Sequence, residues 1–333
     1  MKKDDIISAL VHLGSKMGDS LKDDQGLFEM AYLKNNWFTR ANIELCFQSW
    51  IDLLKEDSLI SWSKGVNYAN EPKIVGLVLA GNLPLVGLHD LVSVLITGHS
   101  AKLKLSSDDS VLMQWVIDVI CSFNPIIQKR IVKAERIKEI DAVIATGSNN
   151  TSRYFEYYFK DIPSIIRKNR TGIAVLKGDE SSENLRSLGK DIFSYFGLGC
   201  RNVSKIYIPQ NYNFTKFIEA NLDYEELVNH NKYANNYTYH KSIFLMNGTV
   251  HLDTGFLLLK EDENLHAPLG CAFYQHYKDL DKLVDKLNTQ KEEIQCVVSD
   301  GTFPGSIGFG ETQNPALNTY ADGVDTLAFL GRI

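Results

Sequence analysis

The spacing of apolar residues changes near residue 73, and the change separates two kinds of predicted structure. Over residues 4–63, apolar side chains recur every three or four positions, as at Ile6, Leu10 and Leu13, which is typical of helices. From residue 73 onward, short continuous apolar runs alternate with stretches of helical spacing. The first run, 74–80, has the composition of a strand that is buried on both faces.

This alternation predicts an α/β fold with a parallel, doubly wound sheet. The expected strands are 74–80, 100–105, 141–145 and 173–176. The helices expected between them are 85–97, 111–123 and 152–159. Pro84 suits the first turn of one helix, and the polar run 106–109 suits the cap of the next.

Polar residues and glycines follow the ends of these predicted strands. Asn82 follows the first strand, Lys104 ends the second, and Gly147 and Ser148 follow the third. Parallel sheets of this kind bind ligands at the carboxyl ends of their strands, so we expect a ligand site there. The GxGxxG fingerprint of an ordinary Rossmann domain is absent, so the usual grip on a pyrophosphate is not predicted.

The strongest candidate for chemistry is Cys200. A helix predicted over 182–196 leads into the glycine-containing turn 197–199, and a strand over 205–208 follows the cysteine. Two glycines in this turn allow a tight backbone that presents a thiol to a cleft. A small buried side chain is the other common fate of a free cysteine, and this stretch alone leaves both interpretations open.

After Cys200 the chain mixes helices with shorter strands. Strands are expected at 256–259 and 296–298, an amphipathic helix at 280–287, and a glycine-rich loop at 303–310. The length of 333 residues and the change of pattern predict two domains, 1–185 with a helical N-terminal part and 186–333.

Composition narrows the class of protein. The net charge of -6 argues against general nucleic-acid binding, which needs a basic face. The five cysteines are scattered without a CxxC pair or a His/Cys cluster, so we expect a reduced, cytoplasmic protein without a metal site. The most membrane-like stretch, 74–88, is too short to span a bilayer and contains Asn82 and Pro84.

Four segments in the same order resemble the aldehyde dehydrogenase superfamily. They are VGLVLAGNLPLVGLHDLVSVLITGHSAKLKLSS, ATGS, GLGCRNVSKIYI and IGFGETQNPALNTY, and together they extend the resemblance from about Lys73 to the C-terminus. The resemblance implies a nucleotide-binding domain over 1–185. It implies a second α/β domain, the catalytic one, over 186–333, with a return segment at its end.

Two departures make the acyl-CoA reductase family, which includes the fatty-acid reductase of bacterial bioluminescence, the more similar branch. The stretch Ile166–Arg170 stands where the superfamily carries Glu-Leu-Gly-Gly-Lys with its general base. The chain is also short for an ordinary aldehyde dehydrogenase. The resemblance therefore implies an NADPH-dependent reductase that converts an acyl-CoA or another acyl thioester to a fatty aldehyde.

The resemblance also implies roles for site residues. Cys200 is the nucleophile that becomes acylated, and the Asn82 side chain with the Cys200 backbone N–H holds the oxyanion. Arg201, Lys205 or His266 could lower the pKa of the thiol, and the sequence does not rank them.

For the cofactor, the resemblance assigns Lys104 to the adenosine ribose or its phosphate, and Gly147 and Ser148 to the pyrophosphate. Ser107 stands where NAD-preferring members carry an acid, so it favours NADPH. The neighbouring Asp108 and Asp109 leave NADH open.

The resemblance assigns binding of the nicotinamide ribose to Asn264 or to its neighbour Glu263. Two other classes remain open: a CoA-acylating aldehyde or semialdehyde dehydrogenase, and an inactive relative that serves as a binding module. Expected partners are the thioester substrate and either a second copy of the chain or an enzyme that transfers the acyl group.

Overall fold

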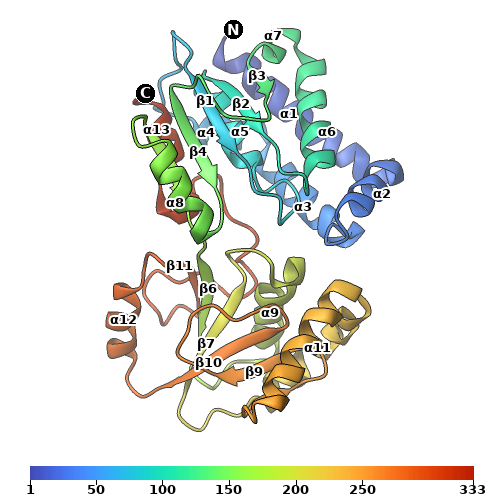
Figure 1. Cartoon of the computed structure of the whole chain (residues 1–333), viewed down its shortest axis with the longest axis vertical. Helices are drawn as coiled ribbons and strands as arrows, with labels where there is room; N and C mark the ends of the chain where they lie inside the picture. Colours follow the sequence, from blue (N-terminus) through green and yellow to red (C-terminus); the bar gives the residue numbers. More distant parts are fainter. The chain divides into compact units, whose positions relative to one another are not determined.

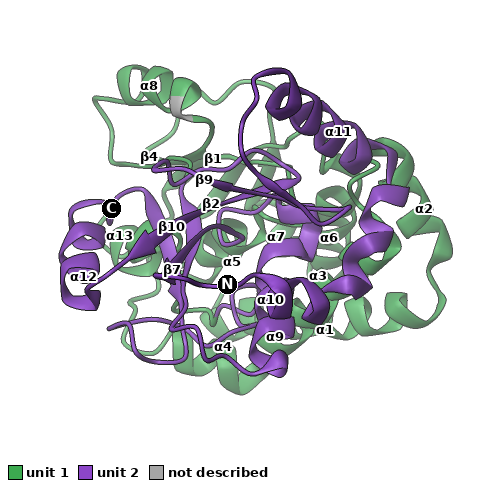
Figure 2. Ribbon diagram, turned by 90° about the horizontal axis from the view of Figure 1, so that it is seen from below, with its two compact units in different colours: residues 1–169, 316–333 green, residues 170–315 purple. Residues whose placement is uncertain are grey.

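The computed structural model describes residues 1–148 and 150–333 in full, and the backbone of Asn149 as part of a helix. The chain folds into two compact units (Figure 2). Unit 1 consists of residues 1–169 and 316–333, and unit 2 of residues 170–315. The division falls after Asn169, not after residue 185 as predicted. The strand and helix at 171–193 belong to the second sheet, which explains the difference.

Unit 1 is built on a sheet of five parallel strands in the order β3-β2-β1-β4-β5 (Figure 1). The strands are β1 (Ile74–Val78), β2 (Ser100–Lys104), β3 (Ile131–Lys133), β4 (Ala142–Thr146) and β5 (Ser164–Arg167). This order confirms the doubly wound sheet. The short strands β3 and β5 were not predicted, because Ile131–Lys133 and Ser164–Arg167 have too few apolar residues to form a run.

The helices of unit 1 precede and connect these strands. They are α1 (Lys3–Asp23), α2 (Gln25–Lys34), α3 (Arg40–Leu53), α4 (Glu56–Trp62), α5 (Leu88–Ile96), α6 (Ser110–Phe123), α7 (Pro125–Gln128), α8 (Asn149–Tyr158) and α13 (Thr326–Leu330). A one-turn 3₁₀ helix, η3 (Ala321–Gly323), precedes α13. The helix α1 contacts α3 and α6, and its residues Leu10, Leu13 and Met17 are completely buried there. The helical N-terminal region is thus part of the unit 1 core.

Two details at the start of α5 and α6 differ from prediction. The helix α5 begins at Leu88, so Pro84 lies in a turn before the helix and not in its first turn. Asp109 precedes α6 but does not cap it, because its carboxylate accepts the backbone N–H of Leu85 at 2.8 Å. Leu85 has a φ of 53°, an unfavourable value for a residue with a Cβ, and this hydrogen bond helps to hold it.

Unit 2 contains a six-stranded sheet in the order β11-β6-β7-β10-β9-β8 (Figure 1). The strands are β6 (Thr171–Val175), β7 (Val203–Pro209), β8 (Leu252–Asp253), β9 (Leu258–Glu261), β10 (Cys271–Tyr277) and β11 (Ile294–Val298). All neighbouring pairs are parallel except β8 with β9. The helices are α9 (Ser182–Phe193), α10 (Thr215–Ala220), α11 (Asn231–Met246) and α12 (Leu280–Thr289), with 3₁₀ turns η1 (Ser194–Gly197) and η2 (Leu222–Asn229).

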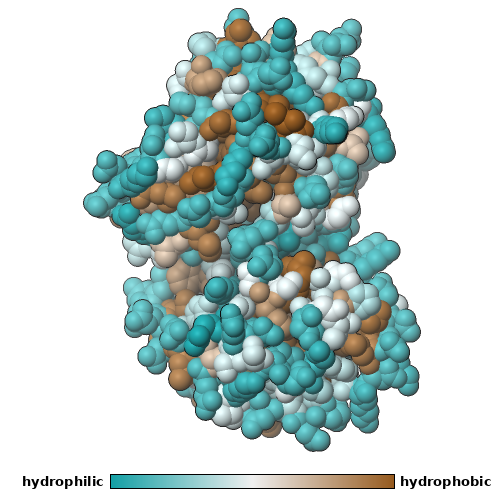
Figure 3. Space-filling view, turned by 180° about the vertical axis from the view of Figure 1, so that it is seen from behind, coloured by the Kyte–Doolittle hydropathy of each residue, from teal (hydrophilic) through white to brown (hydrophobic). Residues whose placement is uncertain are grey.

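Apolar cores cover both faces of this second sheet. Residues of α9 and α10 pack with Ile206 and Ile208 on one face, and residues of α12 pack with Tyr207 on the other. The alternation of β7 side chains between the two cores fixes the strand in register. On the face of the molecule shown in Figure 3, hydrophobic patches lie among mostly hydrophilic residues.

A buried ion pair attaches the C-terminal return segment to the unit 1 sheet. The Arg167 guanidinium, at the end of β5, lies 2.7 Å from the Asp90 carboxylate on α5, and both side chains are less than one tenth exposed. A second arm of the guanidinium donates to the Thr326 hydroxyl of α13 at 3.3 Å. Because α13 also contacts α5, the return segment is held by helix packing and by a hydrogen bond from the buried guanidinium.

Breaking this pair from one side should cost far more than breaking a surface pair. We expect Arg167→Met to lower the free energy of unfolding by about 3–5 kcal/mol, since it leaves the Asp90 carboxylate buried without its partner. The double variant Asp90→Leu/Arg167→Met should recover at least half of that loss. Urea denaturation measures both variants.

The matched control for this prediction is Arg40→Met. Arg40 pairs with Glu44 at 2.6 Å on the surface of α3, where both side chains are about half exposed. Its loss should cost less than about 1 kcal/mol. Equal losses for Arg167→Met and Arg40→Met would contradict the role given to the buried pair.

Candidate functional site

The structure places Cys200 in a tight turn before the central strand β7 of unit 2. The Asn202 backbone N–H donates to the Gly199 carbonyl at 3.0 Å, which closes the turn 199–202 around the cysteine. Cys200 is exposed, whereas the turn is anchored to the core by Asn202, which is 2 % exposed. The thiol therefore projects from a fixed backbone.

The Asn202 side chain is the anchor of this turn. Its Oδ1 accepts the Gly199 N–H at 2.8 Å, and its Nδ2 donates to the carbonyls of Ser194 at 2.9 Å and Asp191 at 3.0 Å. A weaker contact of 3.4 Å reaches the Ile192 carbonyl. These carbonyls end α9, and the last carbonyls of a helix have no partner inside it. One buried amide thus fastens the cysteine turn to the end of the helix.

The backbone between α9 and Cys200 is unusual. The helix was predicted to continue to residue 196, but it ends at Phe193, and Tyr195, Phe196 and Gly197 have φ values of 52°, 59° and 79°. Only glycine adopts such values without strain. Packing holds the two aromatic residues there, since both are buried and the Phe196 ring lies 4.5 Å from that of His230.

The turn also packs closely on its neighbours. A Cβ added at Gly172 on β6 would lie 2.5 Å from the Arg201 carbonyl oxygen, so only glycine fits beneath the turn. The Cys296 thiol of β11 donates to the same oxygen at 3.6 Å. The position of Cys200 therefore depends on three strands of the second sheet.

Cys200 differs from the other four cysteines in its exposure. Burial raises the pKa of Cys271 and Cys296 to about 12. Burial also raises the pKa values of Cys46 and Cys121 above that of an ordinary cysteine thiol. Since the thiolate is the reactive form, these four thiols are poor nucleophiles at neutral pH. The distinction favours Cys200 as the reactive thiol over the interpretation as a small buried residue.

The glycine-rich closing segment lies beside the cysteine helix. Asp191, which is completely buried on α9, accepts the backbone N–H groups of Gly310 at 2.7 Å and Thr312 at 3.0 Å. Burial raises the pKa of this carboxyl above its ordinary value despite these hydrogen bonds. The segment resembling the superfamily's closing motif is thus fixed to the helix that leads to Cys200.

The segment 262–267, the first part of the connection between β9 and β10, carries the residues expected at the nicotinamide ribose. Glu263 and Asn264 are both exposed. The Asp262 carboxylate accepts the Asn264 backbone N–H at 2.9 Å and its side-chain amide at 2.8 Å, so the loop is folded onto itself. The Lys205 ammonium, one candidate for lowering the pKa of Cys200, instead donates to the Asp262 carbonyl.

In unit 1, Asn82 lies exposed in the loop after β1. Two hydrogen bonds to buried side chains hold this loop. The Leu85 N–H donates to the Asp109 carboxylate, and the Cys46 thiol donates to the Pro84 carbonyl at 3.2 Å. Asp109 is 2 % exposed, and burial raises its pKa well above the ordinary value. Asp109 therefore supports the Asn82 loop and does not face a cofactor ribose.

The other predicted residues of unit 1 lie at the same carboxyl edge of the sheet. Lys104 ends β2 next to Val78 of β1, and the exposed Ser107 follows it. The Ser107 hydroxyl contacts the exposed Asp108 carboxylate at 3.3 Å. Of the two aspartates that follow Ser107, only Asp108 is thus at the surface.

Gly147 and Ser148 form the turn between β4 and α8. The Ser148 hydroxyl caps α8 by accepting the Thr151 N–H at 3.3 Å. A Cβ at Gly147 would lie 3.0 Å from the Thr151 side chain, so the chain approaches the helix closely here. A ten-residue helix that starts at a strand end has the geometry used for phosphate binding, which fits a dinucleotide.

The stretch that the resemblance aligns with the superfamily's general base has a structural role. Arg167 is committed to Asp90 and Thr326, and Lys168 pairs with Glu156 at 2.8 Å. None of the residues 166–170 is acidic. No carboxylate base is therefore supplied by this part of the chain.

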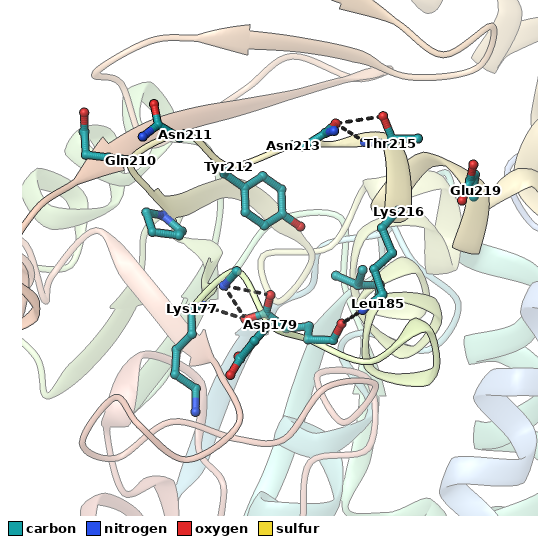
Figure 4. Close-up of a pocket in the computed structure, with 13 residues that line it drawn as sticks. Lys177, Asp179, Leu185, Gln210, Asn211, Tyr212, Asn213, Thr215, Lys216 and Glu219 are labelled. Carbon is teal, nitrogen blue, oxygen red and sulfur yellow. Dashed lines mark hydrogen bonds between the residues drawn. The ribbon is translucent and has the colours of Figure 1, made fainter.

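A cavity of about 700 Å³ lies in unit 2 at the opposite end of β7 from Cys200 (Figure 4). Its polar groups are largely paired with one another. Within the lining, Glu180 accepts the Gly178 N–H at 3.1 Å and Lys216 donates to the Glu180 carbonyl. Lys177 pairs with Asp300, outside the lining, at 2.5 Å. The cavity is therefore separate from the cysteine site.

Comparison with solved structures identifies the fold. Aldehyde dehydrogenase 21 from Physcomitrella patens, solved with the product succinate, superposes with a TM-score of 0.70 and 10% identity over 100% of this chain and 84% of that one. A putative aldehyde dehydrogenase from Burkholderia cenocepacia superposes with a TM-score of 0.64 and 13% identity, over 87% of this chain and 73% of that one. An NAD+ complex of an aldehyde dehydrogenase from Bacillus cereus superposes with a TM-score of 0.64 and 11% identity, over 90% of this chain and 72% of that one.

The chain has the aldehyde dehydrogenase fold. This confirms the predicted α/β architecture with two units of the aldehyde dehydrogenase type. No protein-family model and no curated protein matches the sequence. At 10–13% identity, these likenesses establish the fold only.

Two features are absent from the described residues. No described helix is long and apolar enough to cross a membrane. Among the same residues, no three His, Cys, Asp or Glu side chains come together as a metal site.

The sequence reasoning missed Asn202, Asp191 and Gly172, which support Cys200 without bearing on its reactivity directly. An Asn at the end of a four-residue turn that begins with Gly199 was a usable signal, since Asn side chains often bind nearby backbone groups. Nothing local signalled Asp191 or Gly172. Their partners lie at 310–312 and at 201–202, which only the tertiary fold brings to them.

Removing the Asn202 amide should loosen the cysteine turn. We expect Asn202→Ala to speed amide hydrogen exchange over 197–203 by at least tenfold. The reason is that it removes several hydrogen bonds worth about 1 kcal/mol each, and tenfold corresponds to about 1.4 kcal/mol. Exchange followed by mass spectrometry measures the effect.

Asn221→Ala is the matched control. Asn221 is completely buried in the same unit and donates to the carbonyls of Leu185 and Phe217, so its loss is chemically similar. Exchange over 197–203 should not change in this variant. Unaltered exchange of the turn in Asn202→Ala would refute the anchoring role.

Proposed function

We propose that the protein is an acyl-CoA reductase that makes a fatty aldehyde from an acyl thioester through a thioacyl intermediate on Cys200. The observation that carries the proposal is an exposed cysteine, held in an anchored turn on an aldehyde dehydrogenase fold, without a carboxylate in the stretch 166–170. The fold suits an oxidoreductase of aldehydes, and the missing base favours reduction of a thioester over hydrolysis.

The first step is attack of the Cys200 thiolate on the thioester carbonyl. The C–S bond to Cys200 forms, the bond to the coenzyme A sulfur breaks, and the released thiolate takes up a proton. The Asn82 amide and the Cys200 backbone N–H are assigned to the oxyanion. Each preorganised donor of this kind lowers the activation free energy by about 3 kcal/mol. The anchored turn serves this step by fixing both the sulfur and the neighbouring N–H.

The edge of the unit 1 sheet fits a nicotinamide dinucleotide. The pyrophosphate is assigned to the first turn of α8 with Gly147 and Ser148, and the adenosine ribose to Lys104 and Ser107. When bound, the reduced nicotinamide supplies a hydride to the thioacyl carbonyl. The proposed balance is one acyl-CoA, one NADPH and one proton converted to one aldehyde, one coenzyme A and one NADP+.

NADPH is proposed as the preferred cofactor. Several structural neighbours are NAD+ complexes, so a nicotinamide dinucleotide suits the fold. Ser107 offers a hydroxyl where an acid would repel a 2′-phosphate, and Asp109 is turned into the core toward Leu85. Asp108 remains beside Ser107 as the residue that would favour NADH.

The same chemistry in reverse is the activity of a CoA-acylating aldehyde dehydrogenase. The absence of a base at 166–170 is compatible with both directions, because neither direction uses water. The direction is tested by following NADPH oxidation with acyl-CoA substrates of increasing chain length and identifying the aldehyde formed. NADP+ reduction with aldehyde and coenzyme A that is much faster than NADPH oxidation with acyl-CoA would favour the dehydrogenase.

Cys200 should be the only cysteine that becomes acylated. We expect Cys200→Ala to abolish covalent labelling by radiolabelled acyl-CoA. Cys121→Ala, Cys271→Ala and Cys296→Ala should label normally, since burial raises the pKa of all three thiols. Labelling that persists in Cys200→Ala would remove the basis of the mechanism. An unlabelled wild-type protein would favour an inactive binding module.

Ser107 should control the choice between NADPH and NADH. We expect Ser107→Asp to raise the ratio of kcat/KM for NADH over NADPH by at least tenfold, because a carboxylate repels the 2′-phosphate and accepts from the ribose hydroxyl. Initial rates with both cofactors measure this ratio.

Ser122→Asp adds the same charge at the far end of α6, about 20 Å away along the helix, and should leave the ratio unchanged. If Ser107→Asp also leaves it unchanged, the adenosine ribose does not bind at the end of β2. A wild-type preference for NADH would give the selecting role to Asp108.

A further inference from the structure

A buried lysine lies five residues after Cys200. Lys205 is completely buried in the middle of β7, where Ile173 of β6 and Phe273 of β10 are its neighbours in register. Its ammonium donates to the Asp262 carbonyl and lies 5.2 Å from the centre of the Tyr207 ring. Burying an ammonium is costly, and an apolar side chain is the ordinary choice for a central strand. The mechanism proposed above makes no use of this cation.

Ser204, the residue before Lys205, binds the same segment of the chain, 262–267. The Ser204 hydroxyl donates to the Leu265 carbonyl at 2.9 Å and lies 3.5 Å from the Ala267 backbone nitrogen, which donates to it. Lys205 and Ser204 therefore hold the segment 262–267 near its beginning, middle and end. This segment has no regular secondary structure, so these side chains replace the hydrogen bonds that a strand or helix would provide.

The charges around the ammonium come from α12, from the end of β9 and from the segment 262–267. Burial is the largest cause that lowers the pKa of Lys205, to about 8, and the ammonium of Lys286 on α12 lowers it further. The carboxylates of Glu261, Asp262 and Glu263 act in the opposite direction. The lowered pKa means that burial disfavours the charged form, and the hydrogen bond to the Asp262 carbonyl partly offsets this cost.

We propose that Lys205 is a positioning residue that, together with Ser204, fixes the segment presenting Glu263 and Asn264 to the nicotinamide ribose. The inference rests on the proposed function, because that function gives Glu263 and Asn264 their role. Under this inference β7, the strand that follows the nucleophile Cys200, also holds the segment 262–267. One strand then sets the positions of both reacting groups.

The test replaces the cation by an apolar chain of similar length, Lys205→Met, in the full-length protein. Hydrogen exchange over 262–267 is measured without cofactor, NADPH affinity by its fluorescence, and the rate of Cys200 acylation by intact mass. We expect exchange at least tenfold faster and NADPH binding about tenfold weaker, with acylation within twofold of wild type.

Lys286→Met is the matched control. Lys286 lies 5.6 Å from the same Tyr207 ring, and its ammonium binds Gln275 at 3.0 Å. At pH 7 this variant should keep the exchange of 262–267 and the NADPH affinity of wild type.

Two outcomes would overturn the inference. One is wild-type exchange of 262–267 in Lys205→Met. The other is an equal loss of acylation and cofactor binding, which indicates a general structural role. If wild type binds no NADPH but its segment loosens in Lys205→Met, the proposed function fails while the hold of Lys205 on the segment stands.

Discussion

The buried amide of Asn202 is the interaction on which the candidate site depends. It joins the end of α9 to the turn that carries Cys200, and so fixes an exposed thiol with a side chain that is 2 % exposed. The strained residues Tyr195 and Phe196 can persist because this anchor and their own packing hold both ends of the connection. A nucleophile needs such fixation, since misplacement by about 1 Å can cost 10²-fold in rate.

The same arrangement recurs elsewhere in the two units. A polar side chain is buried, at a cost, and its hydrogen bonds hold a segment that carries exposed polar residues. Asp109 supports the loop of Asn82, Asp191 fixes the closing segment, and Lys205 holds the segment 262–267. Buried polar groups are expensive unless they are satisfied, so their presence beneath exposed loops indicates selection for position rather than for stability.

Apolar periodicity predicted the three central strands of the unit 1 sheet, β2, β1 and β4, because buried parallel strands such as 74–78 form continuous apolar runs. It failed at Pro84, where local preference favoured a helix start but the Asp109 carboxylate holds Leu85 in a left-handed turn. It also misplaced the boundary between the units, since β6 looks like one more strand of the first sheet until its pairing with β7 is known. Cys200 and Asn82 could be named from sequence as candidates, whereas the supports beneath them depend on contacts that are distant along the chain.

The central claim is that the thioacyl enzyme is made for reduction and not for hydrolysis. The most direct measurement acylates the protein with acyl-CoA, removes excess substrate, and follows the acyl-enzyme by intact mass with and without an added thiol. The stretch 166–170, which the resemblance aligns with the superfamily's base, holds no carboxylate, and cations are poor bases at neutral pH, so the account predicts a long-lived acyl group that passes to the thiol faster than to water. Release as free acid within a few turnovers would contradict the account, because another residue would then activate water.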